Sequence, residues 1–350
     1  MSESASFNPI CSKKYFSYFL QSDGLHALSN CLHLKPELLE CVLTSQKNYH
    51  RFQIPKKKGG VRIIQAPFNP LKTIQERLRV FLNGMYSKYA PDYVNGFVKH
   101  CNGQTKKNIL TNAEPHVGRA WVLNMDIEDF FPSISAAQVR KRLLEGPVQL
   151  QSRETASIVA LLTTLDWHLP TGSSCSPVLS NIVFFETDVQ LKALSDELGL
   201  TYTRYADDLT FSSDTMIESK TIEQLIAIIE AAGFTINRRK FRLQSRHGGQ
   251  FVTGIKVNEK LNIDRGYIRN LRAILHNWEV HGINKASERY FSDRKRGQRT
   301  LFMQHAFIQS IAGRIGFLKT VKKDEPVVTQ LDALFTKLSD RFYYHEEHRI

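Results

Sequence analysis

The first fifty residues carry apolar side chains at the three- and four-residue spacing of amphipathic helices. One apolar stripe falls within 15–20, and a leucine-rich segment at 28–43 continues the pattern. Pro36, with Glu37 beside it, is placed as in the first turn of a new helix. We expect residues 1–50 to form an N-terminal helical region that serves packing or docking, because nothing in it points to chemistry.

Residues 51–67 alternate between apolar and polar side chains and predict a β-hairpin. Its tip is basic and contains glycine, with Lys56 at its start and Arg62 on the return strand. A flexible cationic hairpin suits the gripping of a triphosphate, with the Arg62 guanidinium forming a fork on phosphate oxygens. A solvated loop whose lysines oppose edge-strand aggregation fits equally well, so the hairpin alone leaves both interpretations open.

Two apolar, strand-like segments carry carboxylates where a strand would end or turn. Residues 121–126 run into Asp126, and residues 200–211 contain Tyr-Ala-Asp-Asp, with Asp207 and Asp208 adjacent. Ionised carboxylates near a core are costly unless a partner balances them. No Lys or Arg closely follows the pair Asp207 and Asp208. Asp is also common in turns because it tolerates their geometry. The upstream carboxylate favours a bound divalent cation over a plain turn.

Helical spacing of apolar residues recurs between and after these strands. A small-residue loop at 169–177 leads into an expected helix at 177–194, and its small side chains would let a base pair or phosphate approach the backbone closely. An ordinary helix N-terminus with proline in its first turn is the alternative. Further helices are expected at 71–86, 140–165 and 221–232, and a second hairpin at 250–263.

The charge of the chain changes this picture more than its composition does. Its 350 residues suffice for two or three subdomains, and 42% hydrophobic and 23% charged residues are typical of a globular protein. The formal net charge of +13 is unusual and favours a polyanionic partner. Thirteen Lys or Arg against three acidic residues fall within 265–323, which a phosphate-tracking surface explains better than a solvated face.

Several function classes are disfavoured by what the sequence lacks. Five cysteines without a Cys-x-x-Cys pair argue against a zinc ribbon and fit a reducing compartment. A His-Glu-Glu-His run at 345–348 is better explained as a polar terminus than as a metal site. The first thirteen residues do not resemble a signal peptide, and no apolar run is long enough to span a bilayer. A cytoplasmic protein with no membrane partner is expected.

Three carboxylates can converge if the strand ending at Asp126 lies beside the hairpin that carries Asp207 and Asp208. The 81 residues that separate the two anchors (207 − 126) leave room for two helices and the small-residue loop. Two divalent ions about 4 Å apart would assist phosphoryl transfer, one activating a hydroxyl and one neutralising pyrophosphate. Oxygen ligands favour Mg²⁺ for both positions, with Mn²⁺ as the alternative ion.

In this order, the motifs resemble those of reverse transcriptases. Asp126 followed by Ile-Glu-Asp-Phe-Phe resembles motif A. The loop at 169–177 resembles motif B, and Tyr-Ala-Asp-Asp at 205–208 resembles motif C. The combination is far more specific than Tyr-x-Asp-Asp alone.

The resemblance continues beyond these three motifs. Gly-Phe-Thr-Ile-Asn at 233–237 with Lys240 resembles motif D, and Val-Thr-Gly at 252–254 resembles motif E. The latter and Asn-Ala-Glu-Pro-His at 112–116 also resemble signatures of bacterial retron reverse transcriptases. The similarity runs from about residue 51 to at least residue 323, where the basic helices resemble a thumb.

The resemblance implies a role for each matching residue. Asp126, Asp207 and Asp208 would ligate the metals, helped by the Ile127 backbone carbonyl. The residues expected to bind the nucleotide are Lys56, Arg62, Asp129, Phe131, Thr171, Gly172 and Lys240. Those expected to bind nucleic acid are Asn112, His116, Val252, Thr253, Gly254, Arg265, Arg269, Arg272, Arg294, Lys295 and Arg296.

Some of these residues keep a second interpretation. Phe131 matches the aromatic ring that excludes a ribose 2′-hydroxyl, although a core phenylalanine is the alternative, as expected for Phe130. Lys240 would donate a proton to pyrophosphate or be a solvated lysine, and His116 would make a structural or an RNA hydrogen bond. Thr171 departs from the family pattern, which usually has Gln there, and its shorter side chain reaches less far toward the nucleotide.

We therefore expect an α+β protein with the right-hand polymerase fold, in which an antiparallel palm sheet carries the acidic residues. The expected domains are an N-terminal helical region at 1–50, fingers at 51–120, a palm at 121–263 that includes part of the fingers at 135–170, and a basic helical thumb at 264–350.

The expected function is that of an RNA-directed DNA polymerase. The resemblance implies a cognate structured noncoding RNA as template and primer, dNTPs as substrates, and a branched RNA–DNA product started from an RNA 2′-hydroxyl. It also implies antiphage defence with an effector protein. A non-catalytic RNA-binding scaffold that holds an effector is the alternative, and a group II intron maturase is disfavoured by the compact length.

Overall fold

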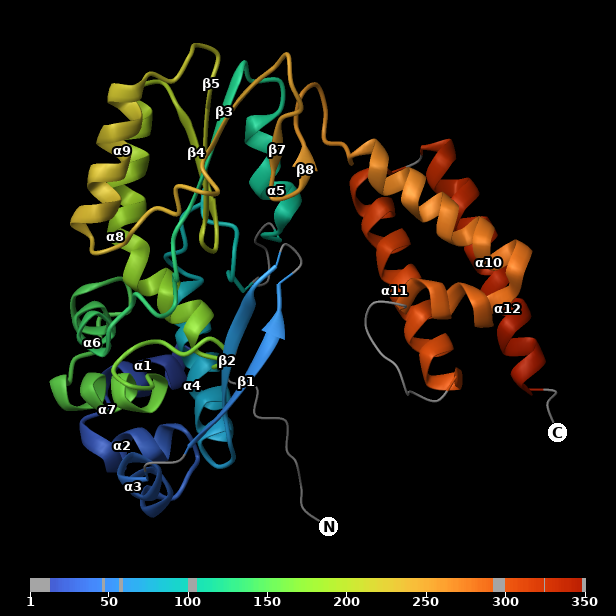
Figure 1. The fold of residues 1–350 in the computed structure, drawn as a ribbon. Coiled ribbons are helices and arrows are strands. Elements are labelled where there is room, and N and C mark those ends of the chain that lie inside the picture. Colours follow the sequence, from blue (N-terminus) through green and yellow to red (C-terminus); the bar gives the residue numbers. More distant parts are fainter. Residues whose placement is uncertain are drawn as a thin grey trace. The chain divides into compact units, whose positions relative to one another are not determined.

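The computed structural model describes residues 13–45, 48–56, 59–99, 106–291, 300–323 and 325–347. The chain divides into two compact units, Met1–Gly248 and Gly249–Ile350, each with its own hydrophobic core. The first unit combines helices with a four-stranded antiparallel sheet, which confirms the expected α+β class (Figure 1). Within the described ranges, every helix is too short or too polar to span a bilayer.

The first unit begins with short helices, of which α1 packs against the longer α4 (Leu71–Tyr86), while α2 and α3 pack against α7 (Arg153–Thr163). Phe19 stacks on Phe81 of α4, with 4.9 Å between ring centroids. Pro36 occupies the first turn of its helix, as predicted from the sequence. The elements before α4 are α1 (Lys13–Gln21), α2 (Gly24–Cys31), α3 (Pro36–Thr44) and the predicted hairpin, β1 (Tyr49–Pro55) and β2 (Val61–Pro67).

The sheet of the first unit brings together strands that are far apart in the sequence. Its order is β4-β5-β3-β6, and every neighbouring pair is antiparallel. The two central strands therefore present Asp126 directly opposite Asp208. The strands are β3 (Trp121–Asp126), β4 (Thr201–Tyr205), β5 (Asp208–Ser213) and β6 (Arg242–Ser245).

Helices cover this sheet and link it to the N-terminal part of the unit, and α8 and α9 lie side by side on one of its faces (Figure 1). The segment 140–165 was expected to be largely helical, but it contains two helices. Gly146 caps the first and Pro147 cannot continue it, while Ser152 caps the second. The helices are α5 (Ile109–Ala113), α6 (Ala136–Glu145), α7 (Arg153–Thr163), α8 (Ser176–Glu197) and α9 (Ser219–Ala231).

The second unit starts with a small hairpin, β7 (Phe251–Val252) and β8 (Ile255–Lys256), and its described residues continue as helices, the first of which is broken by a kink at Gly282 (φ +77°). Thr253 and Gly254 form its two-residue turn with φ of +48° and +83°, the backbone that such hairpin turns require. The helices are α10 (Arg265–Phe291), α11 (Thr300–Val321) and α12 (Pro326–Glu347). The hairpin belongs here with the helices, and the division into fingers, palm and thumb stays a prediction.

Candidate active site

Three carboxylates meet at one end of the four-stranded sheet. Asp126 ends β3 and faces Asp208, the first residue of β5. The Ile127 backbone N–H donates to the Asp207 carbonyl at 3.1 Å, and the Asp126 carbonyl accepts from the Asn237 backbone N–H at 2.7 Å. The strand end carrying Asp126 is thus tied to the turn carrying Asp207 and to the segment before β6.

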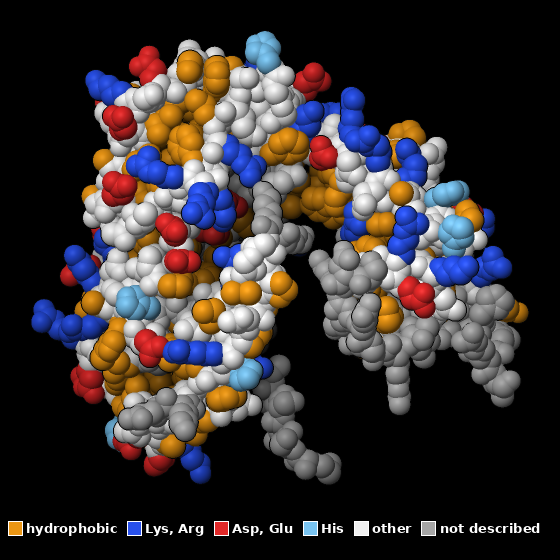
Figure 2. Space-filling view, viewed as in Figure 1, with side chains coloured by type: hydrophobic (Ala, Val, Ile, Leu, Met, Phe, Trp, Pro, Cys, Tyr) orange, Lys and Arg blue, Asp and Glu red, His pale blue; other side chains and the backbone are white. Residues whose placement is uncertain are grey.

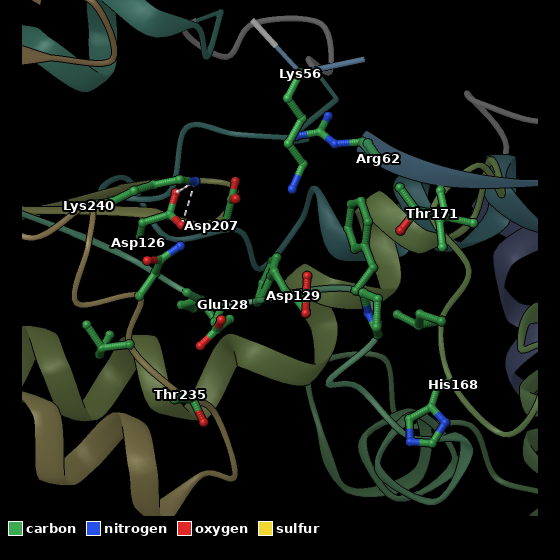
Figure 3. Close-up of a pocket in the computed structure, with 18 of the residues that line it drawn as sticks. Lys56, Arg62, Asp126, Glu128, Asp129, His168, Thr171, Asp207, Thr235 and Lys240 are labelled. Atoms are coloured by element: carbon green, nitrogen blue, oxygen red, sulfur yellow. Dashed lines mark hydrogen bonds and ion pairs between the residues drawn. The ribbon is translucent and has the colours of Figure 1, made fainter. Parts of the chain in front are cut away.

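A protein cation already pairs with the most buried of these carboxylates. Lys240 Nζ lies 2.7 Å from both Asp126 carboxylate oxygens, and the Asp126 side chain is only 8% exposed (Figure 3). The sequence argument about missing countercharge concerned Asp207 and Asp208, and it did not anticipate this partner of Asp126. Lys240 lies 114 residues further along the chain, so inspecting the neighbouring residues could not reveal it.

The other two carboxylates are less well balanced. Burial and the charge of Asp126 raise the pKa of Asp207 above its usual range. Asp208 is an exposed residue overall, yet partial burial of its carboxyl and the charges of Asp207 and Asp126 raise its pKa to about 7. Carboxylates that crowd one another in this way gain from an additional cation.

The donor atoms at this sheet end have the chemistry of a divalent-metal site. Carboxylate and backbone carbonyl oxygens are the ligands that Mg²⁺ and Mn²⁺ take. In the described part of the chain, no three or more His, Cys, Asp or Glu side chains are already arranged to hold a metal ion. The residues thus fit the ion in type, and an ion at Asp126 would compete with Lys240 for the same oxygens.

An open cleft of about 1190 Å³ is lined by Asp126 and Asp207, whereas Asp208 is not among its lining residues. Figure 3 shows Asp126, Asp207 and Lys240 on one side of the cleft and Thr171 on the opposite side. Lys56 and Arg62 reach the cleft from the β1–β2 hairpin. Figure 2 shows acidic and basic side chains close together on this unit. Of the expected metal and nucleotide residues, those lining the cleft are Lys56, Arg62, Asp126, Ile127, Asp129, Phe131, Thr171, Asp207 and Lys240.

The structure places Gly172 beside the hairpin and not in the cleft lining. The Gln65 backbone N–H of β2 donates to the Thr171 carbonyl at 2.9 Å. Gly172 has φ of +150°, and a Cβ there would lie 2.6 Å from the Gln65 carbonyl oxygen. The loop therefore joins the hairpin through its backbone, and glycine is needed for that close approach.

Phe131 lies within a group of aromatic rings at the cleft. Its ring centroid is 5.9 Å from those of Phe97 and Phe130. Phe130 is 6% exposed and belongs to the hydrophobic core, as the sequence predicted. Phe131 is only half-buried and lines the cleft, so its ring limits the space there.

Two of the residues expected to bind nucleic acid lie inside the first unit. Asn112 and His116 are fully buried. The His116 ring nitrogens lie 2.7 Å from Ser212 Oγ and 2.8 Å from Thr203 Oγ1, and burial lowers the pKa of His116 to about 3. The structure gives them packing and hydrogen-bonding roles and leaves them no surface with which to touch a nucleic acid.

The remaining residues of that set belong to the second unit. Val252 is fully buried, and Thr253 and Gly254 form the hairpin turn. Figure 2 shows Lys and Arg side chains following one edge of this unit. Arg294, Lys295 and Arg296 lie outside the described residues. The exposed arginines on one face of α10, which we name the α10 arginine stripe, are Arg265, Arg269 and Arg272.

One buried residue next to the acidic turn was missed in the sequence. Arg204, directly before Tyr205, is fully buried and forms an ion pair with Asp188 of α8. The available signal was an arginine inside an otherwise uncharged strand, because a buried guanidinium requires a buried partner.

Comparison with known proteins defines the class to which this fold and site belong. The family described as reverse transcriptase (RNA-dependent DNA polymerase) matches residues 54–263. This span covers more than half of the chain and includes the acidic strands and the cleft. The chain therefore belongs to the reverse transcriptase family.

Curated relatives narrow this class. The chain is 36% identical to the retron Mx65 reverse transcriptase of Myxococcus xanthus over 66% of this chain and 56% of that protein. It is 32% identical to the retron Ec86 reverse transcriptase of Escherichia coli over 73% and 78%, respectively. The chain thus belongs to the bacterial retron reverse transcriptases, although it spans only about half the length of the Mx65 protein.

A solved structure of a foamy viral protease–reverse transcriptase in complex with double-stranded DNA is 15% identical, with a TM-score of 0.44, over 87% of this chain and 42% of that chain. A likeness of that size supports no further conclusion about this chain.

Proposed function

We propose that this reverse transcriptase copies part of a cognate structured noncoding RNA into DNA by phosphoryl transfer at the sheet end. The observation that carries the proposal is the placement of Asp126 opposite Asp208, with Asp126 and Asp207 facing a cleft that Arg62 and Phe131 also line. The cleft volume of about 1190 Å³ exceeds the roughly 300–1,000 Å³ of small-ligand sites, which leaves room for a nucleotide beside a strand.

In this proposal the carboxylates of Asp126, Asp207 and Asp208 and the Ile127 carbonyl would hold two Mg²⁺ ions. When bound, such ions activate the attacking hydroxyl and neutralise charge on the leaving pyrophosphate. Arg62, with Lys56, holds the triphosphate of the incoming dNTP through charge-assisted hydrogen bonds. Asp129 and Thr171 shape the cleft wall beside it.

Phe131 and Lys240 would act on opposite ends of the nucleotide. The half-buried Phe131 ring leaves no room for a 2′-hydroxyl and so selects deoxynucleotides. Lys240, held at Asp126 in this structure, is near enough to the carboxylates to give a proton to pyrophosphate once that pairing is released.

The RNA-related part of the proposal rests on family membership and on charge. Because the chain belongs to the retron reverse transcriptases, we extend to it what the motif resemblance implies: a noncoding RNA that serves as template and primer, a branched product joined to an RNA 2′-hydroxyl, and antiphage defence with an effector protein. The α10 arginine stripe supplies phosphate contacts that do not depend on base sequence.

A double substitution, Asp207→Asn with Asp208→Asn, tests the catalytic assignment in cells that express the cognate RNA. We expect the small RNA-linked DNA to disappear. Asp214→Asn is the matched control, because Asp214 is an exposed carboxylate just beyond β5 that pairs with Arg119 at 2.7 Å. If the DNA still accumulates in the double variant, the catalytic assignment is wrong and the scaffold alternative gains support.

A further inference from the structure

A buried polar cluster lies directly next to the turn that carries Asp207 and Asp208. Its centre is Arg204 of β4, whose side chain has no exposed surface. Arg204 Nε donates to Asp188 Oδ1 at 2.7 Å and Nη2 donates to Oδ2 at 2.6 Å. The Tyr202 hydroxyl donates to the same carboxylate at 2.8 Å, so Asp188 of α8 holds the guanidinium in one fixed plane.

The remaining nitrogen of Arg204 reaches the turn itself. Nη1 donates to the Ala206 carbonyl at 2.9 Å and to Asn181 Oδ1 at 3.1 Å. Asn181 also belongs to α8, and its Nδ2 donates to the Gly96 carbonyl at 2.9 Å. One guanidinium therefore connects helix α8 to the residue that immediately precedes Asp207.

The turn has a backbone conformation that needs such support. Ala206 has φ of +58° at the first of the two residues between Tyr205 and Asp208. Glycine is usual there, because an L side chain disfavours a positive φ. Gly96 packs against the same peptide so closely that a Cβ at position 96 would lie 2.2 Å from the Ala206 nitrogen. A disfavoured turn persists only where its surroundings hold it.

Stability alone explains this cluster poorly. Replacing a buried ion pair by apolar side chains of similar volume is often neutral or stabilising, because desolvating two charges is costly. A bidentate pair whose spare donor binds a turn carbonyl does add directional control of that turn, which apolar packing lacks.

We propose that Arg204, fixed by Asp188 and Asn181, is a positioning residue that orients the turn so that Asp207 and Asp208 face Asp126. The inference rests on the proposed role of these three carboxylates in metal binding. Loss of the cluster lets the turn relax and separates the carboxylates, so the site binds a divalent ion less tightly even when the protein stays folded.

The test measures binding of Mn²⁺ alone to the full-length chain, by electron paramagnetic resonance of the free ion. We expect Asp188→Asn and Asn181→Ala each to weaken Mn²⁺ binding about tenfold or more. Asn181→Ala leaves the Arg204–Asp188 pair intact and guards against a variant that fails to fold. Glu186→Gln is the matched control, since Glu186 lies on the same helix and pairs with Arg142; it should bind Mn²⁺ as the wild type does.

Wild-type Mn²⁺ affinity in folded Asn181→Ala and Asp188→Asn would overturn the inference, because the cluster would then serve packing only. Circular dichroism identifies which variants are folded at the assay temperature. DNA synthesis on a primed template is measured separately. A wild type that binds Mn²⁺ but makes no DNA refutes the proposed function, while the ordering of Mn²⁺ affinities among the variants still decides the role of Arg204.

Discussion

Lowering the pH from 7.5 to 5 should destabilise the first unit through His116, whose ring is fully buried beside the sheet. Both ring nitrogens are hydrogen bonded, to Ser212 Oγ and to Thr203 Oγ1. Burial, helped by the charge of Arg119, lowers the pKa of His116 from 6.5 to about 3. At pH 5 the folded protein therefore keeps this ring neutral, while the unfolded chain takes up a proton on it.

The size of the effect follows from this difference in proton uptake. Because the folded-state pKa lies below the unfolded-state value, the unfolded chain binds more protons, and stability falls as the pH drops from 6.5 toward 3. At about 1.5 pH units below 6.5, and at about 1.36 kcal/mol per unit, the loss is about 2 kcal/mol. Above pH 7.5 both states are neutral at His116, and the effect vanishes.

Urea unfolding at pH 7.5 and pH 5.0, followed by tryptophan fluorescence, measures this loss. A Trp278→Phe background removes the tryptophan of α10, so that the remaining tryptophans, all in the first unit, report. Between pH 7.5 and pH 5.0, the free energy of unfolding of the wild type should fall by about 2 kcal/mol more than that of His116→Gln. The control His50→Gln removes an exposed histidine of β1 and should follow the wild type. An equal loss with and without His116 would refute the reasoning.

Three further predictions concern the cleft and the second unit. Phe131→Ala should lower the preference for deoxynucleotides over ribonucleotides on a primed template by at least about tenfold, because each 1.4 kcal/mol of lost discrimination is tenfold. An unchanged preference would show that Phe131 does not exclude the 2′-hydroxyl. Changing the three arginines of the α10 arginine stripe to glutamine should weaken RNA binding and reduce the slope of log K against log salt by roughly 2–2.7. Equal slopes in the wild type and the variant would show that these arginines do not contact RNA phosphates. Gly172→Ala should cost about 1–3 kcal/mol of stability and raise the KM for dNTPs, because the new Cβ meets the Gln65 carbonyl; the melting temperature and dNTP kinetics check this, with Gly199→Ala, strained but unobstructed, as control.

Elements with local signals were predictable from the sequence. The expected helix at 71–86 coincides with α4, because its apolar spacing is regular over four turns. Pro36 begins α3, and Gly233, with φ of +86°, follows the end of α9. The acidic strands were also recognisable, since an apolar run that ends in a carboxylate is unusual. These features depend on residues within a few positions of one another.

Features that depend on contacts across the sheet were not predictable. The pairing of Lys240 with Asp126 arises because β6 lies beside β3, which no nearby residue indicates. The side chain of His116 points into the protein because the 3₁₀ turn Glu114–His116 packs against β4 and its ring reaches side chains of β4 and β5. The motif at 112–116 alone therefore could not distinguish burial from RNA contact. The break at Gly146 and Pro147 was visible in the sequence, but the apolar pattern on both sides of it obscured the end of α6.

The rule that a buried carboxylate needs a partner also separates the acidic residues of this unit by role. Asp188 is fully buried and is paired with Arg204, which ties it to the turn as a structural support. Asp126 is paired with Lys240, a lysine whose side chain is 55% exposed and therefore displaceable. Among the described residues, none forms an ion pair with Asp207 or Asp208, and both carboxyls have raised pKa values. Asp188 thus has a permanent buried countercharge, whereas the countercharge at Asp207 and Asp208 is incomplete, as the proposed binding of an external cation requires.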